Sequence, residues 1–457
     1  MNSTKPALSG MRAFTLVWIG QFVSILGTAM TQFGLTIWAY QITGQATALA
    51  LVGFFNFAPT IILSPIAGAL VDRWNRKLVM MLSDLGAGIA TIFVVIMYAT
   101  NNLQMWHLYV AGAFTGAFQA FQFPAYSASI SLMLRKEDYA RASGMMMLAE
   151  SAPNIIAPVT ASFLLAAVGL SGIMVIDIVT FVFALITVFI VFIPQPPVTE
   201  AGRKAQGNLL QESIFGFRYI LARPSLLGLQ LVFFSINLVA SFTNVLVAPM
   251  ILARTNQDAT TLGLVQSVFG IGGVIGAVLL SVWGGPKRRV HGVLLGMIAS
   301  SLLGQTLMGL GNGLIFWLPA AFFFMFFIPV INGSNQAIWQ AKVAPDVQGR
   351  VFSARRLIAQ ITVPVALILT GPLADRVFEP AMMPGGALAS IFGGVIGTGP
   401  GAGMALMFVL FGALGVVVGL GGYLFPAIRD AEDLLPDHHA DAQQAPQPVG
   451  EPAQQTN

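Results

Sequence analysis

The chain has 457 residues, of which 56% are apolar and only 9% are charged. That balance excludes a soluble fold and predicts an all-α polytopic membrane protein. The formal net charge of +4 is explained better by where the basic residues lie than by a nucleic-acid partner, which we do not expect. With no Cys and four scattered His, the sequence offers no thiol nucleophile and no metal site, and we expect neither a cofactor nor catalysis.

Twelve apolar runs are long enough to span a bilayer, which takes about 20 residues each. They lie at 14–40, 47–70, 78–99, 104–132, 142–168, 172–194, 226–253, 258–283, 291–311, 313–341, 351–375 and 402–426. With the N-terminus placed inside, all but two of the 22 Lys and Arg fall on the inner side, the exceptions being Arg254 and Arg376. This bias predicts a multi-pass protein of a bacterial inner or plasma membrane with both termini cytoplasmic.

The order of the runs predicts four parts. We expect a six-helix half at 1–194, a cytoplasmic linker at 195–225, a second six-helix half at 226–426 and a disordered cytoplasmic tail at 427–457. The tail is acidic and rich in Pro and Gln, without a core-forming pattern. Two six-helix halves joined by a linker place a substrate site between them, near the middle of the membrane.

The segment GALVDRWNRK at 68–77 carries four charges between two apolar runs. It resembles the loop G-x-L-x-D-R-x-G-R-K between helices 2 and 3 of major facilitator superfamily transporters. Asn75 replaces the second glycine, and Asn tolerates the left-handed turn conformation that glycine would supply. The resemblance implies an inner gate, closed when Asp72 lies against the N-terminus of helix 11. The gating residues would be Gly68, Asp72, Arg73, Arg76, Lys77 and Arg350.

A second pattern lies in the fifth apolar run. Gly144, Pro153, Ala157 and Pro158, followed by Ala161 and Ser162, resemble the antiporter signature of the superfamily, G-(x)8-G-(x)3-G-P-(x)2-G-G. Small residues permit close helix packing, so we expect helix 5 to pack against helix 8. The facing surface would be made by Gly270, Gly272, Gly273 and Gly276. The alternative is a generic packing seam kinked by proline.

Three further segments are similar to the macrolide-efflux and enterobactin-exporter branch of drug:proton antiporters. They are WIGQFVS at 18–24, FPA at 123–125 and QGRVF at 348–352, and the resemblance covers about 11–426. It implies a monomeric exporter in the lipid bilayer whose partners are a small-molecule substrate and protons. Many such antiporters carry an Arg in helix 4, four residues before a glycine. Here Gly112 precedes Gly116, so a proton path through that Arg is not available.

Three acidic residues lie within apolar runs, where ionisable groups are costly and therefore candidates for function. They are Asp84, Glu150 and Asp177. Glu150 is the deepest, and we expect it to carry the coupling proton, although it could be a neutral helix contact. Asp84 could instead pair with the basic cluster at 73–77, and Asp177 could reach water at the outer face.

Neutral amides are spread over the helices that line the cavity in this superfamily. Helices 1 and 4 carry Gln21, Gln32, Gln119 and Gln122, and Thr28 lies on helix 1. Helices 7 and 10 carry Asn237, Asn244, Asn332, Asn335 and Gln336. A cavity of amides with few charges suits a large, amphipathic, weakly charged substrate.

The sequence therefore predicts a proton-coupled exporter of a drug-like, macrolide-like or siderophore-like molecule. The alternative is a facilitator or importer of a small nutrient, although a sugar site would need more polar and charged residues in the cavity. A membrane enzyme would need a nucleophile with a base, or a metal cluster, and no His or Cys lies at depth.

Overall fold

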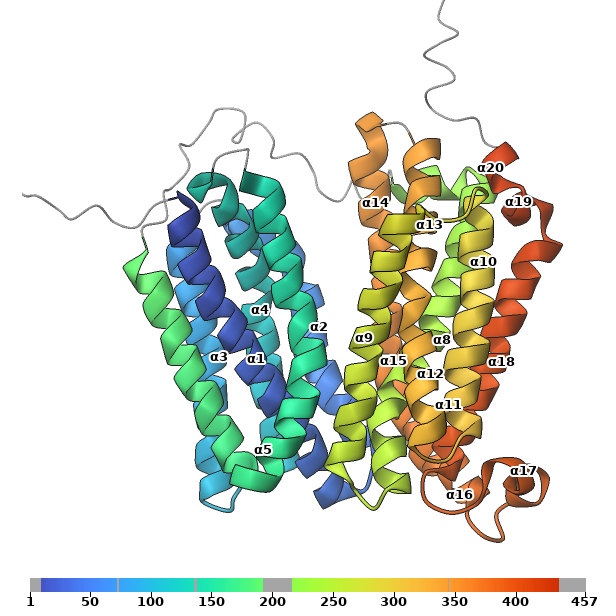
Figure 1. The fold of residues 1–457 in the computed structure, drawn as a ribbon, viewed down its shortest axis with the longest axis horizontal. Helices are drawn as coiled ribbons and strands as arrows, with labels where there is room; N and C mark the ends of the chain where they lie inside the picture. The colour runs from blue at the N-terminus through green and yellow to red at the C-terminus, as the bar shows by residue number, and fades with distance from the viewer. Residues whose placement is uncertain (1–9, 72–73, 135–137, 192–215, 344, 435–457) are drawn as a thin grey trace, which may run out of the picture.

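The computed structural model describes residues 10–71, 74–134, 138–191, 216–343 and 345–434. Within these ranges, some side chains also lie outside the described part, among them those of Arg76, Glu150 and Arg350. Every element with assigned bounds is a helix, and the helices form two bundles that stand side by side (Figure 1).

The first bundle contains the N-terminal helices α1 (Gly10–Thr43), α2 (Ala46–Val71), α3 (Arg76–Ala99), α4 (Met105–Met133) and α5 (Tyr139–Ile190). At 52 residues, α5 is long enough for two membrane passes. Its two parts are separated at Gly169, where φ is 68° and ψ is −179°. Glycine adopts this conformation without the steric cost that a side chain would add, so the chain can reverse there. The first half therefore has six passes.

The second bundle also has six passes, several of them built from consecutive pieces. Its elements are α8 (Pro224–Arg254), α9 (Ala259–Trp283), α10 (Arg289–Ala299), η2 (Ser300–Thr306), α11 (Leu307–Leu310), α12 (Leu314–Phe326), α13 (Ile328–Lys342), α14 (Pro345–Gln360), α15 (Thr362–Leu373), η3 (Ala374–Phe378), α16 (Glu379–Met382), α17 (Ala389–Ile396), α18 (Ala402–Leu424), α19 (Pro426–Arg429) and α20 (Ala431–Leu434). Among the described residues, ten helices are long and apolar enough to cross a membrane. With α4 and the second pass of α5, they complete the twelve passes that the sequence predicts, in two six-helix halves.

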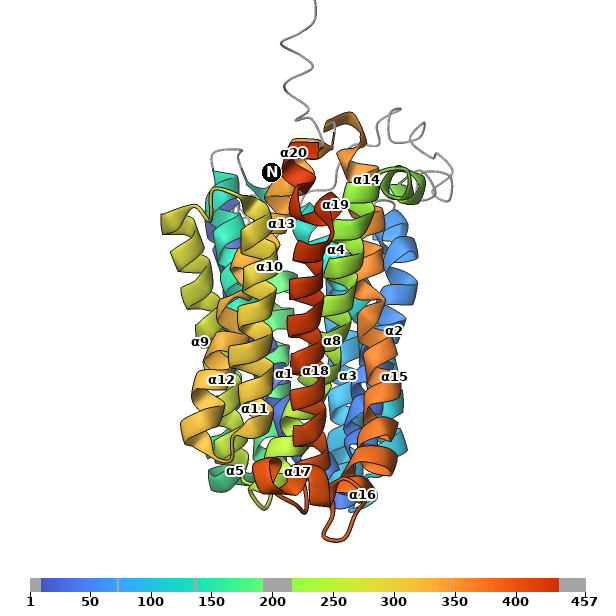
Figure 2. The same cartoon turned by 90° about the vertical axis from the view of Figure 1, so that its right-hand side faces the viewer.

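The two ends of the molecule differ in how the halves meet. We call the end that carries the start of α1 and helices α19 and α20 the terminal face, and the end that carries α16 and α17 the hairpin face (Figures 1 and 2). Toward the hairpin face, one hydrophobic core contains residues of both halves, including Phe33, Ile37, Leu246 and Trp317. Toward the terminal face, each half has a separate core. The halves are therefore packed together at the hairpin face.

Helix α5 packs against α9, which is helix 8 of the twelve passes. The hydroxyl of Ser267 donates a hydrogen bond to the carbonyl of Ile155 at 2.6 Å. A Cβ on Gly263 would lie 2.6 Å from the carbonyl oxygen of Pro158, and a Cβ on Gly270 would lie 2.3 Å from Ile155 Cγ1. The helix pairing that we expected is therefore present.

The prediction of which glycines of α9 face α5 is wrong in part. Only Gly270 of the four glycines contacts α5, whereas Gly272 and Gly276 lie against the backbone of Phe322 and Phe326 in α12. Successive residues of a helix are about 100° apart, so Gly270 and Gly272 point in nearly opposite directions and the four glycines cannot all lie on one face. The small residue that contacts α5 near Pro158 is instead Gly263, about two turns before Gly270.

The prediction of a disordered tail from residue 427 is wrong for its first part. Residues up to 434 form α19 and α20, and the side chain of Arg288 makes an ion pair with Asp433. The carboxylate of Glu432 accepts a hydrogen bond from the N–H of Val290 at 2.8 Å, at the start of α10. The acidic composition that indicated disorder here complements the basic loop before α10. Residues 435–457 lie outside the described part.

The start of α9 is capped by a side chain. Asp258 accepts hydrogen bonds from the N–H groups of Thr260 at 2.9 Å and Thr261 at 3.2 Å, and from the Thr261 hydroxyl at 2.6 Å. Burial opposes ionisation of this carboxyl, but these hydrogen bonds outweigh it and hold the pKa of Asp258 below its ordinary value. The cap should therefore be fully effective above the ordinary pKa of Asp and lose its effect as the pH falls through the lowered pKa.

We expect Asp258→Ala to lower the free energy of unfolding by about 1 kcal/mol, the typical effect of losing such a cap. Asp258→Asn keeps an acceptor oxygen and should lose less. Thermal unfolding of purified protein in detergent at neutral pH measures both variants. An alanine variant as stable as the parent would show that the cap does not contribute.

Candidate functional site

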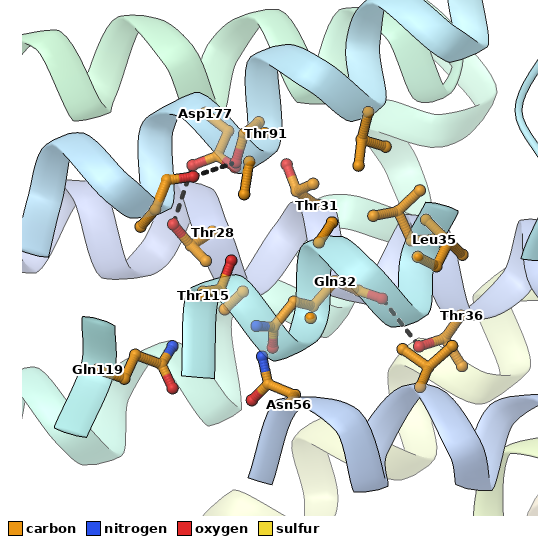
Figure 3. A pocket seen from close by; sticks show the side chains of 18 of the residues that line it. Thr28, Thr31, Gln32, Leu35, Thr36, Asn56, Thr91, Thr115, Gln119 and Asp177 are labelled. Atoms are coloured by element: carbon orange, nitrogen blue, oxygen red, sulfur yellow. Dashed lines mark hydrogen bonds between the residues drawn. The ribbon is translucent and has the colours of Figure 1, made fainter. Parts of the chain in front are cut away.

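A cavity of about 600 Å³ lies in the first half, where it meets the second. Helices α1 to α5 provide most of its wall, and the second half contributes Val245, Ala248, Gln266 and Leu367. On α1 the lining residues run from Gln21 to Ala39, which corresponds to five turns of helix. The wall mixes aliphatic side chains with amides and hydroxyls (Figure 3). The described lining residues include two carboxylates and no basic side chain.

Asp84 is held by two amides at one end of this cavity. Its Oδ2 accepts a hydrogen bond from Gln21 Nε2 at 2.9 Å, and its Oδ1 accepts one from Gln122 Nε2. Gln122 Nε2 also donates to Gln21 Oε1 at 3.0 Å, so the three side chains form a closed network. Among described side chains, Lys77 is not a partner of Asp84, since its ammonium donates to the carbonyls of Phe189 and Val191 at 2.7 and 2.8 Å. The described contacts therefore favour a cavity role for Asp84 over pairing with the basic loop.

Asp177 lies in the wall of the same cavity, next to α1 (Figure 3). Its side chain is 2% exposed, so in this conformation it does not reach water at the outer face. Oδ1 accepts a hydrogen bond from the Thr28 hydroxyl at 3.0 Å. Oδ2 is buried and makes no hydrogen bond of ordinary length in the described structure, and the hydroxyls of Thr31 and Thr91 lie beside the carboxylate. A buried carboxylate oxygen without a partner needs a proton or a water molecule to satisfy it.

The structure separates the amides of the two halves. Gln21, Gln32, Gln119 and Gln122 all line the large cavity, as predicted. The C-terminal amides do not. Two of them, Asn237 and Asn332, line a second cavity of about 60 Å³ within the C-terminal half.

The other three C-terminal amides have different surroundings. Asn335 is fully buried and accepts a hydrogen bond from Trp339 Nε1 at 3.1 Å, and Gln336 accepts one from Arg355 at 2.8 Å. Asn244 is exposed and contributes to neither cavity. Asn335 and Gln336 thus bond within their own half, which the sequence could not reveal because it does not fix how each helix is rotated.

The predicted gating loop is only partly visible. Asp72 and Arg73 lie outside the described residues, as do the side chains of Arg76 and Arg350 and the surroundings of Gly68. The described Asn75 has φ of −64°, so it does not use the left-handed conformation that Asn tolerates. Its side chain instead accepts a hydrogen bond from the N–H of Leu78 at 3.2 Å and caps α3.

The residues of the helix 5 motif have different surroundings in the structure. Pro153 lines the cavity, while Ala157 and Pro158 are buried at the seam with the second half. Gly144 is exposed, and a Cβ there would meet no neighbouring atom within 4 Å. The side chain of Glu150, the acid that we expected to carry the proton, lies outside the described part.

Several residues of the cavity were missed from the sequence. Asn56 on α2 and Gln266 on α9 both line it, as do the hydroxyl residues Thr91 and Thr115 (Figure 3 labels all except Gln266). Asn56 is the single amide in the second apolar run, which is a signal that could have identified it. The threonines gave no such signal, because Thr is common in apolar helices as a packing residue.

These features define a class of protein: a polytopic helical transporter whose two halves enclose a polar cavity within the membrane-spanning region. A sequence profile described as the Major Facilitator Superfamily matches residues 17–366. The chain belongs to this superfamily.

Known relatives include exporters. The chain is 27% identical over 373 residues to macrolide efflux protein A of Streptococcus pyogenes, covering 80% of this chain and 90% of the relative. It is 23% identical over 269 residues to the enterobactin exporter EntS of Shigella boydii, covering 58% of this chain and 62% of the relative. The efflux branch that the sequence resembles is thus found among its relatives.

Solved structures agree on the fold. A bacterial homolog of the human lysosomal transporter Spinster, in an inward-facing and unoccupied conformation, has a TM-score of 0.65 at 15% identity and covers 94% of this chain and 98% of its own. A bacterial homologue of the iron transporter ferroportin, in an inward-facing state, has a TM-score of 0.62 at 15% identity and covers 91% and 99%. At such identities the likeness concerns the fold alone.

Proposed function

We propose that this protein exports an amphipathic small molecule, of a drug-like, macrolide-like or siderophore-like kind, in exchange for protons. The observation that carries the proposal is the buried carboxylate of Asp177, whose Oδ2 makes no hydrogen bond of ordinary length in the wall of a large polar cavity. Burying an ionised carboxylate is costly, and proton binding removes much of that cost. A group of this kind can bind a proton on one side of the membrane and release it on the other.

The packing of the halves supports alternating access. The shared core closes the hairpin face, and the separate cores leave the terminal face free to open. The distribution of Lys and Arg supports a cytoplasmic position for the terminal face. With that orientation, the conformation described here is inward-facing, the state in which an exporter takes up its substrate.

The chemistry of the cavity supports a weakly charged substrate of some size. Its volume of about 600 Å³ lies within the range of cavities for drug-sized ligands. Amides and hydroxyls can orient polar groups of the substrate, while the aliphatic wall accommodates its apolar part. The names of the relatives, a macrolide efflux protein and an enterobactin exporter, support export over import.

Bacterial cells with and without the protein provide the test. We expect expression to lower the intracellular level of at least one macrolide, other amphipathic antibiotic or siderophore severalfold, and to raise the growth-inhibiting concentration of a toxic substrate accordingly. A protonophore should abolish the difference. Lower accumulation that survives collapse of the proton gradient would contradict proton coupling. Higher uptake of a nutrient in expressing cells would favour the facilitator or importer instead.

A further inference from the structure

The carboxylate of Asp375 joins the two halves at the hairpin face. Asp375 lies in η3 of the C-terminal half and accepts hydrogen bonds from the N–H groups of Ala46 at 3.0 Å and Thr47 at 2.8 Å, and from the Thr47 hydroxyl. Ala46 and Thr47 are the first residues of α2 in the N-terminal half. A helix N-terminus has N–H groups without intrahelical partners and a partial positive charge, so a carboxylate is a favourable partner for it.

The helices on either side of this contact are closely packed. A Cβ on Gly371 would lie 2.4 Å from Thr47 Cα, and a Cβ on Gly53 would lie 3.0 Å from Leu367 Cδ2. The backbones of α2 and α15 thus touch beside the bonded carboxylate. The hairpin face cannot open between these helices without breaking the three hydrogen bonds of Asp375.

The long loop before α18 holds Asp375 in place within its own half. The carboxylate of Glu379 accepts hydrogen bonds from the N–H groups of Gly401 at 3.0 Å and Met404 at 2.8 Å, at the start of α18. Arg254 donates to the carbonyl of Ile396 at 2.8 Å. These bonds lie within the C-terminal half, so they fix η3 without contributing to the contact between halves.

We propose that Asp375 is a gating residue, which holds the hairpin face closed by capping the N-terminus of α2 from the opposite half. The contact forms when the halves approach at this face and breaks when substrate leaves through it. It lies at the opposite end of α2 from the loop at 68–77, so the two ends of this helix serve different gates. The inference rests on the alternating access of the proposed function.

Distances between spin labels test the proposal directly. The chain has no Cys, so Asn102→Cys and Met383→Cys can carry a single label pair at exposed positions on the two halves. In detergent without substrate, the parent should give mainly the short distance of a closed hairpin face. Asp375→Ala should shift the ratio of closed to open conformers about tenfold toward open, the effect of ~1.4 kcal/mol. A distance distribution unchanged from the parent would overturn the proposal.

Two further variants separate gating from general damage. Thr47→Val removes only the hydroxyl donor, so it should shift the ratio in the same direction by a smaller factor. Glu379→Gln keeps one acceptor oxygen and alters bonds that stay within one half, so it should shift the ratio of closed to open conformers much less than Asp375→Ala. A shift with Glu379→Gln as large as with Asp375→Ala would assign the effect to loop disorder and overturn the proposal. The measurement needs no substrate and no pH gradient, so it stands apart from whether export is proton-coupled.

Discussion

Asp177→Asn should abolish proton-driven accumulation of substrate while preserving substrate binding. Asparagine keeps an oxygen for the Thr28 hydroxyl, which donates to Asp177 Oδ1 at 3.0 Å, but it cannot exchange a proton. In one-for-one exchange, a gradient of two pH units can support roughly a hundredfold gradient of substrate, since each unit corresponds to about 1.4 kcal/mol. The variant should reach only the level of passive equilibration. Proteoliposomes with an imposed pH gradient measure this directly.

The other buried acids serve as comparisons in the same assay. Asp84→Asn offers one acceptor oxygen where Gln21 and Gln122 now donate to two, so we expect weaker stability and lower transport without a specific loss of coupling. Glu150→Gln tests the acid that the sequence favours. If Asp177→Asn concentrates substrate as the parent does, the proton travels elsewhere, and a loss in Glu150→Gln would then identify its carrier.

The sequence predicts the fold well because its main signal is physical. Apolar runs of about 20 residues between charged loops define membrane passes with little ambiguity, and the order of twelve runs specifies two halves. The same reasoning identified Asp84 and Asp177, since an ionisable residue stands out in an apolar run. The four amides of helices 1 and 4 were found for the same reason.

Which residues meet across helices is beyond this kind of reasoning. Asn335 and Gln336 occur in the sequence much as Gln119 and Gln122 do, yet they bond within the C-terminal half. Their direction depends on the rotation of helix 10, which packing determines. Asp375 was missed because its partners include the backbone N–H groups at the start of α2. Nearly every residue has such a group, so the contact cannot be recognised from the amino-acid sequence.

Bulky substitutions at the seam between α5 and α9 should have the second large effect on export. Ala157 is 1% exposed in the core shared by both halves, and the position of a Cβ on Gly263 lies 2.6 Å from the carbonyl oxygen of Pro158. A leucine at either position adds volume where backbone atoms already touch. Overpacking of this kind typically costs about 1–3 kcal/mol. Because the seam joins the halves, part of that cost should fall on the closed hairpin face and shift the protein toward its open state.

We therefore expect Ala157→Leu and Gly263→Leu to reduce export at least tenfold while the protein remains in the membrane. Gly273→Ala is the matched control, because a Cβ there would lie 4.0 Å from its nearest neighbour, in ordinary contact with Met325. It should export normally. Membrane-fraction blots establish that each variant is present, and efflux from preloaded cells measures transport. Normal export by Gly263→Leu would exclude close packing of α5 on α9 as a requirement of the cycle. Loss of the protein from the membrane would instead assign the effect to folding, and the smaller change Gly263→Ala would then separate the two.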